Sequence, residues 1–275
     1  MLNKMLQQLT DKEKQALITH FRLADQPGSR EETISMDMLL EQTFLEKYLN
    51  QLQHKFGTDS QFVAGSQLMK RIGFVMATPF LYTMTAYHKC LPLELENCFL
   101  VSSYKAGKWL PNLYIKDVTV EKINEENREK QRAELINKLF NHIYQLINHI
   151  SKVSKVPRPI LWENVAIYIY WLYETKMPME LRGMDQKMIV NDFHYLVREA
   201  DASVFQESYN PLARFYNDKR EVEGVDEPVR IRRTCCFFYE TGENESFCST
   251  CPKSRVNKEA CLATKRTLSG QNVWK

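Results

Sequence analysis

The sequence predicts an α+β protein that is mainly helical, has one small antiparallel β element and ends in a loop-rich segment with a cluster of cysteines. Apolar residues recur at steps of three and four along most of the 275-residue chain, as they do on amphipathic helices. Short β-rich runs replace that pattern near residues 91–123. Four of the seven cysteines lie within residues 235–251. We therefore expect a helical scaffold in residues 1–227 and a C-terminal segment in residues 228–275.

The apolar periodicity predicts helices at about residues 10–24, 36–56, 59–88, 121–150, 162–173, 185–201 and 256–268. Thr10 and Glu13 have the spacing of a capping box at the start of the first helix. Gly57 is expected to end the second, because glycine readily adopts the left-handed conformation of a C-cap. Pro79 lies within the third, where it indicates either a kink or a break between two helices.

The β element is expected between Leu91 and Ile123. The runs Cys98–Val101 and Leu113–Ile115 are rich in residues that favour strands, and Lys105–Lys108 bridges them. This pattern predicts a small antiparallel sheet or hairpin. A polar stretch from Asn217 to Pro228 then separates the scaffold from the C-terminal segment.

Charge is distributed unevenly along the chain. The net charge of +3 is too small to indicate nucleic-acid binding, although residues 229–275 hold nine Lys and Arg against four Asp and Glu. The apolar run Val165–Tyr173 is too short to cross a bilayer, which needs roughly 20 residues. Residues 1–9 lack the apolar core of a signal peptide. We therefore expect a cytoplasmic protein with no integral membrane span and no nucleic-acid partner.

The clustered cysteines have the spacing of a metal site. Cys248 and Cys251 are separated by two residues, which lets two thiolates on one turn reach the same metal. Cys235 and Cys236 are adjacent, and neighbouring side chains of an extended chain point to opposite faces, so these two cannot easily share one tetrahedral ion. A cluster with two irons relaxes that demand. The spacing therefore favours a [2Fe–2S] centre held by the four cysteines.

Two alternative hypotheses assign these cysteines to a structural zinc site or to disulfides. A structural zinc site would also take four thiolates, although a zinc ribbon usually has two CxxC pairs, and the protein would then be a non-enzymatic interaction module with a basic tail. Disulfides are less favoured, because the number of cysteines is odd and clustered cysteines in a reducing compartment usually bind metals. The remaining Cys90, Cys98 and Cys261 are expected to be small buried hydrophobic residues.

The cysteine motif resembles that of a known family. Arg-Arg-x-Cys-Cys-x-x-Tyr at Arg232–Tyr239, with a later Cys-x-x-Cys-Pro at Cys248–Pro252, is similar to the ferric siderophore reductases of the FhuF type. Leu161–Ala166 and Asn210–Leu212 are similar to the same family. The family usually has ten residues between the second and third cysteines, whereas this chain has eleven. The extra residue is expected in the turn at Thr241–Asn244, where loops accept insertions.

The resemblance implies an oxidoreductase that passes one electron from a [2Fe–2S] cluster to siderophore-bound Fe(III). Its cluster ligands would be Cys235, Cys236, Cys248 and Cys251. No GxGxxG or P-loop motif is present in the sequence, so the electron would come from a ferredoxin-type protein, a flavoprotein or a small reductant. The candidates to attract an anionic substrate or donor are the basic residues near the cysteines, Arg230, Arg232, Arg233, Lys253 and Arg255.

Overall fold

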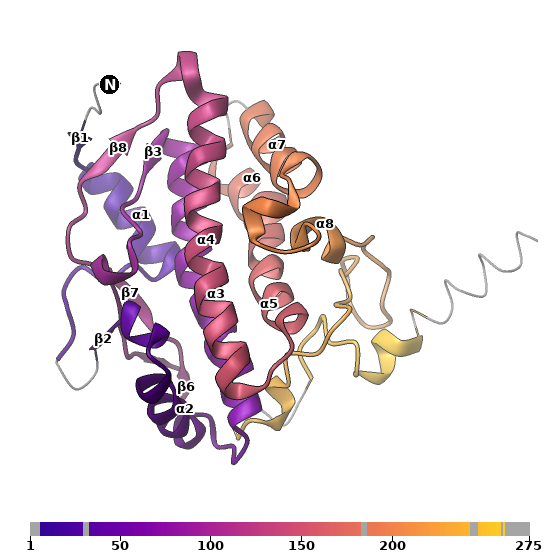
Figure 1. The fold of residues 1–275 in the computed structure, drawn as a ribbon. Helices are drawn as coiled ribbons and strands as arrows, with labels where there is room; N and C mark the ends of the chain where they lie inside the picture. The colour runs from indigo at the N-terminus through magenta and orange to yellow at the C-terminus, as the bar shows by residue number, and fades with distance from the viewer. Residues whose placement is uncertain (1–5, 30–32, 183–185, 243–246, 260, 262–275) are drawn as a thin grey trace, which may run out of the picture.

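Three long helices form the centre of the protein, α3 (Gln61–Tyr87), α4 (Arg128–Ser154) and α5 (Arg158–Trp171). The computed structural model describes residues 6–29, 33–182, 186–242, 247–259 and 261, and in it α3 packs against both α4 and α5 (Figure 1). Because α3 is apolar on nearly all sides, it is buried along almost its whole length. Gly73 lets α3 approach α5 closely, since a β-carbon at this position would lie 3.0 Å from the Cα of Val165.

The other helical elements are α1 (Asp11–Phe21), η1 (Asp37–Leu40), α2 (Gln42–Phe56), η2 (Leu95–Asn97), η3 (Glu125–Asn127), η4 (Leu172–Lys176), α6 (Met177–Glu180), α7 (Gln186–His194), η5 (Tyr195–Glu199), η6 (Ala202–Phe205), α8 (Pro211–Phe215) and η7 (Phe238–Glu240). The capping box of α1 forms as predicted, but the helix ends at a left-handed Arg22 rather than at Ala24. Gly57 ends α2 with a φ of 60°, also as predicted. α3 runs through Pro79 as a single helix, so the two-helix alternative is wrong.

The later helices lie where the sequence predicted them, but their lengths and helix types differ from the prediction. α5 continues into the π-helical turn η4 and then α6, where the sequence indicated one helix ending at Tyr173. α7 and the π-helical turn η5 together fill the range expected for the helix at 185–201. Of the last predicted helix, at 256–268, residues 256–259 and 261 are helical, and residues 260 and 262–268 lie outside the described part of the chain.

The strands are β1 (Leu6–Gln7), β2 (Thr33–Ser35), β3 (Lys89–Cys90), β4 (Cys98–Val101), β5 (Tyr104–Lys105), β6 (Lys108–Trp109), β7 (Asn112–Ile115) and β8 (Val120–Lys122). β4 pairs with β7 and β5 with β6, all antiparallel, which confirms the predicted β element. Ala106 and Gly107 both have positive φ, as a two-residue hairpin turn requires. β2 adds to the other edge of β4 and was not predicted.

The predicted start of the fourth long helix is wrong. Val120–Lys122 forms β8, the central strand of a second small sheet between β1 and β3, instead of the first turn of a helix. Asn124 then caps the turn η3, and α4 begins only at Arg128. Residues 121–127 are mostly charged or polar and show no helical repeat of apolar residues. The structure at Val120–Lys122 is therefore set by pairing with the distant strands β1 and β3.

A segment with little regular structure follows α8, and we call residues 228–242 and 247–259 the cysteine segment. It lies beside the ends of α3 and α5 at which those helices begin (Figure 1). A boundary between a scaffold and a C-terminal unit at residue 228 stays a prediction. Across the described residues, no helix has the length and apolar character that crossing a membrane requires.

Candidate metal centre

The four clustered cysteines are arranged as two pairs. The Sγ atoms of Cys235 and Cys251 are 3.8 Å apart, and the thiols of Cys236 and Cys248 are in hydrogen-bonding contact with each other. Adjacent Cys235 and Cys236 therefore have different partners, as the alternation of side chains in an extended chain predicts. Two thiolates that share a tetrahedral metal at about 2.3 Å lie about 3.8 Å from each other. The Cys235–Cys251 pair thus has the spacing of two ligands of one metal ion, and Cys236 and Cys248 form a second pair in contact.

A strained turn directly after the adjacent cysteines sets their positions. Phe237 has a φ of 60°, which is uncommon for a residue with a bulky side chain. In this conformation its backbone N–H donates to the Sγ of Cys235 at 3.3 Å. On the other side of the site, the N–H of Lys253 donates to the Sγ of Cys251 at 3.4 Å. Both sulfurs of this pair therefore accept backbone hydrogen bonds, which stabilise thiolates.

The second pair lies against the positive charge of Lys70, whose Nζ is 3.5 Å from the Sγ of Cys236. A hydrogen bond from Cys248, with the charges of Lys70 and Arg232, lowers the pKa of Cys236 to about 4. The same hydrogen bond raises the pKa of Cys248. In the first pair, burial raises the pKa of Cys235 to about 11. The two halves of the site are therefore electrostatically different.

Glu163 on α5 anchors the chain just before the cysteines. Its carboxylate accepts hydrogen bonds from the backbone N–H groups of Arg233 and Thr234, each at 2.7 Å, and from the Thr234 hydroxyl. Arg232 completes the arrangement with an ion pair to Glu163 at 3.4 Å. Glu163 is almost fully buried, and a buried carboxylate is tolerated only when it is paired and hydrogen-bonded. These contacts fix the cysteine segment on the helices.

Further polar side chains hold the backbone at Cys236. Ser66 and Gln67 on α3 donate to its carbonyl oxygen at 2.9 and 2.6 Å. Asn164 on α5 donates to Ser66 and accepts a hydrogen bond from Arg232 at 2.6 Å. All of these side chains are buried, so α3, α5 and the cysteine segment share one buried hydrogen-bond network.

Two contacts hold the rest of the cysteine segment. The N–H of Gly242 donates to the carbonyl of Phe56, and the Cα atoms of Gly242 and Gly57 lie so close that a β-carbon on Gly57 would be 3.1 Å from Gly242. Asn257 donates to the carbonyl oxygens of Ser249 and Cys251 at 2.9 and 2.8 Å. The first contact fixes the chain after the adjacent cysteines, and the second fixes the Cys248–Cys251 turn.

The basic residues singled out in the sequence have different surroundings. Arg232 is 3% exposed and binds Glu163 and Asn164, so it does not face solvent. Arg230 donates to Glu174 at 2.6 Å and its guanidinium lies 4.1 Å from the Tyr216 ring centroid. Both arginines thus have structural partners within the protein.

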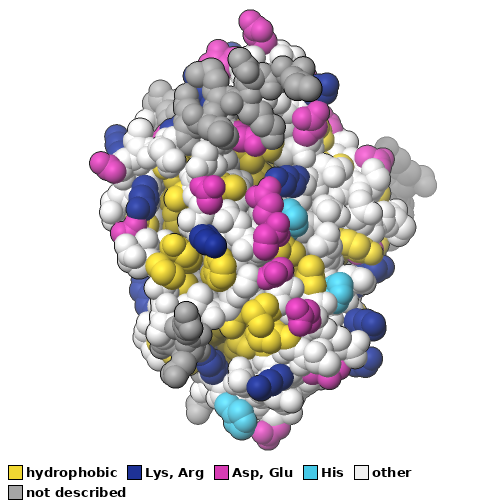
Figure 2. Space-filling model, turned by 60° about the vertical axis from the view of Figure 1, so that its left-hand side comes forward, with side chains coloured by type: hydrophobic (Ala, Val, Ile, Leu, Met, Phe, Trp, Pro, Cys, Tyr) yellow, Lys and Arg dark blue, Asp and Glu magenta, His cyan; other side chains and the backbone are white. Residues whose placement is uncertain are grey.

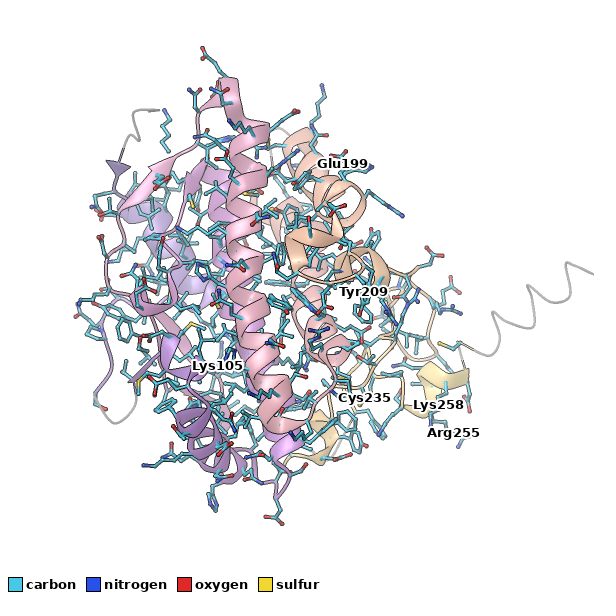
Figure 3. All side chains as sticks on the ribbon, in the orientation of Figure 1. Lys105, Glu199, Tyr209, Cys235, Arg255 and Lys258 are labelled. Carbon is cyan, nitrogen blue, oxygen red and sulfur yellow. The ribbon has the colours of Figure 1, made fainter. Side chains whose placement is uncertain are left out.

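The other three basic residues are exposed. The backbone of Arg233 is held by Glu163, while its side chain faces solvent. Lys253 donates to the Tyr239 hydroxyl at 2.6 Å and lies over the Phe237 ring. Arg255 pairs with Glu259 and, with Lys258, lies beyond Cys235 on the side away from the helices (Figure 3). These side chains border the site on its solvent side.

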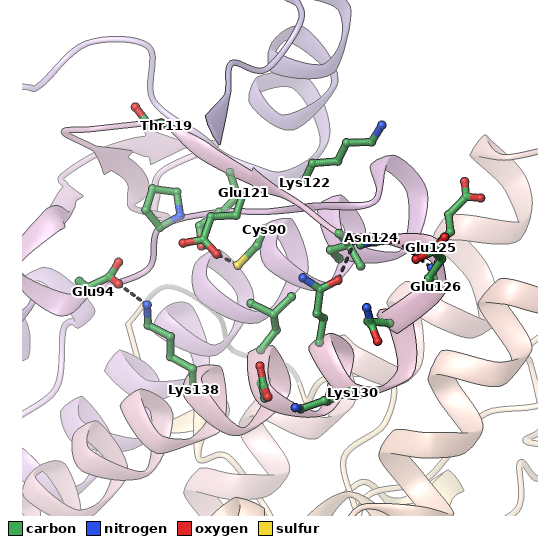
Figure 4. A pocket seen from close by; sticks show the side chains of 17 residues that line it. Cys90, Glu94, Thr119, Glu121, Lys122, Asn124, Glu125, Glu126, Lys130 and Lys138 are labelled. Atoms are coloured by element: carbon green, nitrogen blue, oxygen red, sulfur yellow. Dashed lines mark hydrogen bonds and ion pairs between the residues drawn. The ribbon is translucent and has the colours of Figure 1, made fainter. Parts of the chain in front are cut away.

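A cavity of about 1030 Å³ lies elsewhere, between β8, β3 and the first half of α4 (Figure 4). Gly65 on α3 lies next to Ser66, which contacts the cysteine segment, and it packs against Ser154 at the last residue of α4. The cysteine site is therefore near the C-terminal end of α4, whereas the cavity is along its first half. Lys138 is the cavity residue nearest to Ser154 along α4, and the helical rise puts the two roughly 24 Å apart. The side of the molecule near β1 and β8 shows a column of acidic side chains between hydrophobic patches (Figure 2). The cavity therefore belongs to a different part of the surface.

The donor set fits a [2Fe–2S] cluster better than a single zinc ion. A tetrahedral zinc site draws four thiolates to one point. The cysteines here form two pairs. A cluster with two metal ions uses one pair for each. The fit is helped by Lys70 and by the backbone N–H groups, which offset the negative charge of four thiolates.

Sequence reasoning missed the helix residues of the site, Ser66, Gln67, Lys70, Glu163 and Asn164. One signal for them was present, because Glu163 and Asn164 are polar residues within a run otherwise apolar enough to be buried. Buried polar groups need partners, and such a pair therefore indicates a contact with another segment. Cys90 and Cys98 are buried as expected, whereas Cys261 is only partly buried.

Two protein-family models match the chain. The model described as "Ferric iron reductase FhuF-like transporter" matches residues 66–223, which include α4, α5 and most of α3. The model described as "FhuF 2Fe-2S C-terminal domain" matches residues 232–253, which include all four clustered cysteines. No curated protein and no solved structure matches the chain.

Proposed function

Because the chain belongs to the FhuF-like ferric iron reductase family and has the [2Fe–2S] C-terminal domain of that family, we propose that it reduces siderophore-bound Fe(III) to Fe(II) in the cytoplasm. Cys235, Cys236, Cys248 and Cys251 are the cluster ligands in this proposal. The observation that carries it is the division of these cysteines into two contacting pairs, of which Cys235 and Cys251 have their sulfurs 3.8 Å apart. A reducing compartment suits such free thiols.

The proposed reaction moves one electron and breaks no bond within the protein. The cluster, when bound, supplies a site that accepts and returns a single electron. The electron comes from a ferredoxin-type protein, a flavoprotein or a small reductant, and Fe(III) in the siderophore is reduced to Fe(II). Hard oxygen ligands hold Fe(III) much more tightly than Fe(II), so reduction releases the metal.

The residues around the site have separate tasks in this proposal. Glu163, Ser66 and Gln67 hold the backbone of the cysteine pair against the helices, which keeps the site in one geometry. Arg233 and Lys253 are exposed at its edge and give this face a positive charge. A positive face raises the encounter rate with an anionic ferric chelate or an acidic donor protein.

The proposal is tested by turnover with and without an electron donor. With a ferric siderophore, a ferrous trap and NADPH, the protein should stay near background, because a one-electron cluster does not accept a hydride. Addition of a ferredoxin-type donor and its reductase should start catalysis. The chemically reduced protein alone should deliver about one Fe(II) per cluster.

Two results of this experiment would contradict the proposal. Sustained turnover with NADPH and this protein alone would contradict the need for a separate donor. Failure of the reduced, cluster-loaded protein to deliver any Fe(II) from hydroxamate, catecholate and carboxylate ferric siderophores would contradict the reductase function itself.

A further inference from the structure

Lys70 connects the helix bundle electrostatically to one half of the cysteine site. It lies on α3, one turn beyond Ser66 and Gln67, and its Nζ reaches to 3.5 Å from the Sγ of Cys236. The aromatic ring of Phe238 covers this contact, with its centroid 5.2 Å from the Lys70 ammonium. Because the lysine is partly buried, its charge is less screened by water and salt than a surface charge.

Among the residues that the structure describes, no Lys or Arg side-chain nitrogen is within hydrogen-bonding distance of the sulfurs in the other half of the site, and the Lys253 ammonium attracts Cys235 only from farther away. Cys235 and Cys251 receive hydrogen bonds from the backbone N–H groups of Phe237 and Lys253. Although Lys253 supplies a backbone N–H there, its ammonium is directed to the hydroxyl of Tyr239. Neutral amides stabilise negative charge less than a full positive charge at the same distance. The two halves of the site therefore differ in how well they stabilise an added electron.

Lys108 supports the same asymmetry from a different part of the chain. Its Nζ lies 5.3 Å from the centroid of Phe238, the ring that also contacts Lys70. The β5–β6 hairpin thus brings a second positive charge to the side of the site that holds Cys236. Attraction between the ammonium groups and the aromatic ring helps to hold Lys70 in place beside the sulfur.

We propose that Lys70 is a positioning residue that raises the reduction potential of the cluster by stabilising the added negative charge at its Cys236–Cys248 half. This inference rests on the proposed function, since it requires a cluster on the four cysteines. Reduction by one electron adds one negative charge, and a fixed positive charge a few Å away favours that state. The charge on Lys70 is therefore part of what makes the site reducible by a biological donor.

The inference is tested by spectroelectrochemical titration of the anaerobically purified protein and of Lys70→Met, which removes the charge and keeps much of the side-chain length. The equilibrium constant for one-electron reduction should fall about tenfold, which is about 59 mV to more negative potential for a one-electron couple. Lys70→Arg, which retains the charge, should restore most of the difference. Lys12→Met, on an exposed part of α1 at another region of the bundle, is the matched control and should leave the potential unchanged.

The possible results separate this inference from the proposed function. Equal potentials for Lys70→Met, Lys70→Arg and the unaltered protein would overturn the role of Lys70 and leave the reductase standing. An unaltered protein without a [2Fe–2S] absorption spectrum would instead overturn the proposed function. If Lys70→Met does not retain a cluster, Lys70→Gln takes its place because its amide still donates a hydrogen bond to sulfur. Loss of the cluster in both neutral variants would also overturn the inference, since Lys70 would then act in assembly.

Discussion

The helix bundle and the cysteine segment are held together by different forces. In the bundle, the fully buried rings of Phe140, Trp162 and Phe205 contact one another, and apolar packing continues through the core. The cysteine segment is held mainly by hydrogen bonds from its backbone to buried polar side chains, above all Glu163 and Gln67. The bundle can therefore fold by burial of apolar surface, while the position of the segment depends on a few polar contacts and on the metal centre.

The largest effect that separates the two regions is expected from the cysteines. Cys248→Ser should abolish the cluster, because an iron loses one of its thiolate ligands, and should leave the far-ultraviolet helical signal largely intact. Cys261→Ser is the matched control, since this cysteine lies outside both pairs, and it should retain the cluster. Iron analysis and circular dichroism measure the two quantities. Loss of helical signal with the cluster would mean that the bundle depends on the metal for folding.

The next variant changes the bundle instead of the cysteine segment, by removing apolar packing from its core. Phe140→Ala should lower the free energy of unfolding by about 3–5 kcal/mol, because it deletes a fully buried ring in contact with Trp162 and Phe205. Val190→Ala, at a position that is 63% exposed, should change it little. Denaturant titration followed by circular dichroism measures both. Similar values for the two variants would show that the core does not carry the stability of the bundle.

A smaller effect is expected at the contact between the two regions. Glu163→Gln keeps the shape of the side chain but replaces one acceptor oxygen by a donor and leaves the buried Arg232 without its ion pair. We expect the docked segment to lose about 1–3 kcal/mol of stability, seen as faster cluster loss to an iron chelator at unchanged helical content. The control is Glu46→Gln on the exposed side of α2. An unchanged rate of cluster loss in Glu163→Gln would contradict the anchoring role of this carboxylate.

The smallest expected effect concerns the exposed charges of the cysteine segment. The rate at which an anionic ferric chelate oxidises the reduced protein should fall as salt rises, and should fall a few-fold further in the double variant Arg233→Ala with Lys253→Ala. A neutral ferric chelate should show little of either effect. Stopped-flow measurement at several salt concentrations gives the rates. Rates independent of salt for every chelate would remove the steering role of these residues.

Local patterns in the sequence predicted much of the fold. The capping box of α1, the Gly57 cap of α2 and the β5–β6 turn were found because each depends on residues close together in the chain. The sheet of β1, β8 and β3 was missed because its strands are two or three residues long and β1 is more than 100 residues from β8. Such short strands carry too little periodicity to be separated from a charged helix start.

The sequence allowed the ligands of the candidate site to be predicted, but not the helix residues that hold those ligands in place. The spacing of Cys235, Cys236, Cys248 and Cys251 indicated a metal site, and the structure brings them together as two pairs. Lys70 and Glu163 lie far from the cysteines in sequence, so only the fold shows that they contact the segment. Arg232 was a candidate to attract an anionic substrate or donor because it is a basic residue near the cysteines, and it is instead buried against Glu163.

The central claim is that the two cysteine pairs hold one cluster with two irons. It is tested most directly by counting iron, zinc and acid-labile sulfide per chain after purification without oxygen. We expect two irons and two sulfides in a red-brown protein that dithionite bleaches, with an S = 1/2 paramagnetic signal in the reduced state. A colourless protein with one zinc per chain would contradict it.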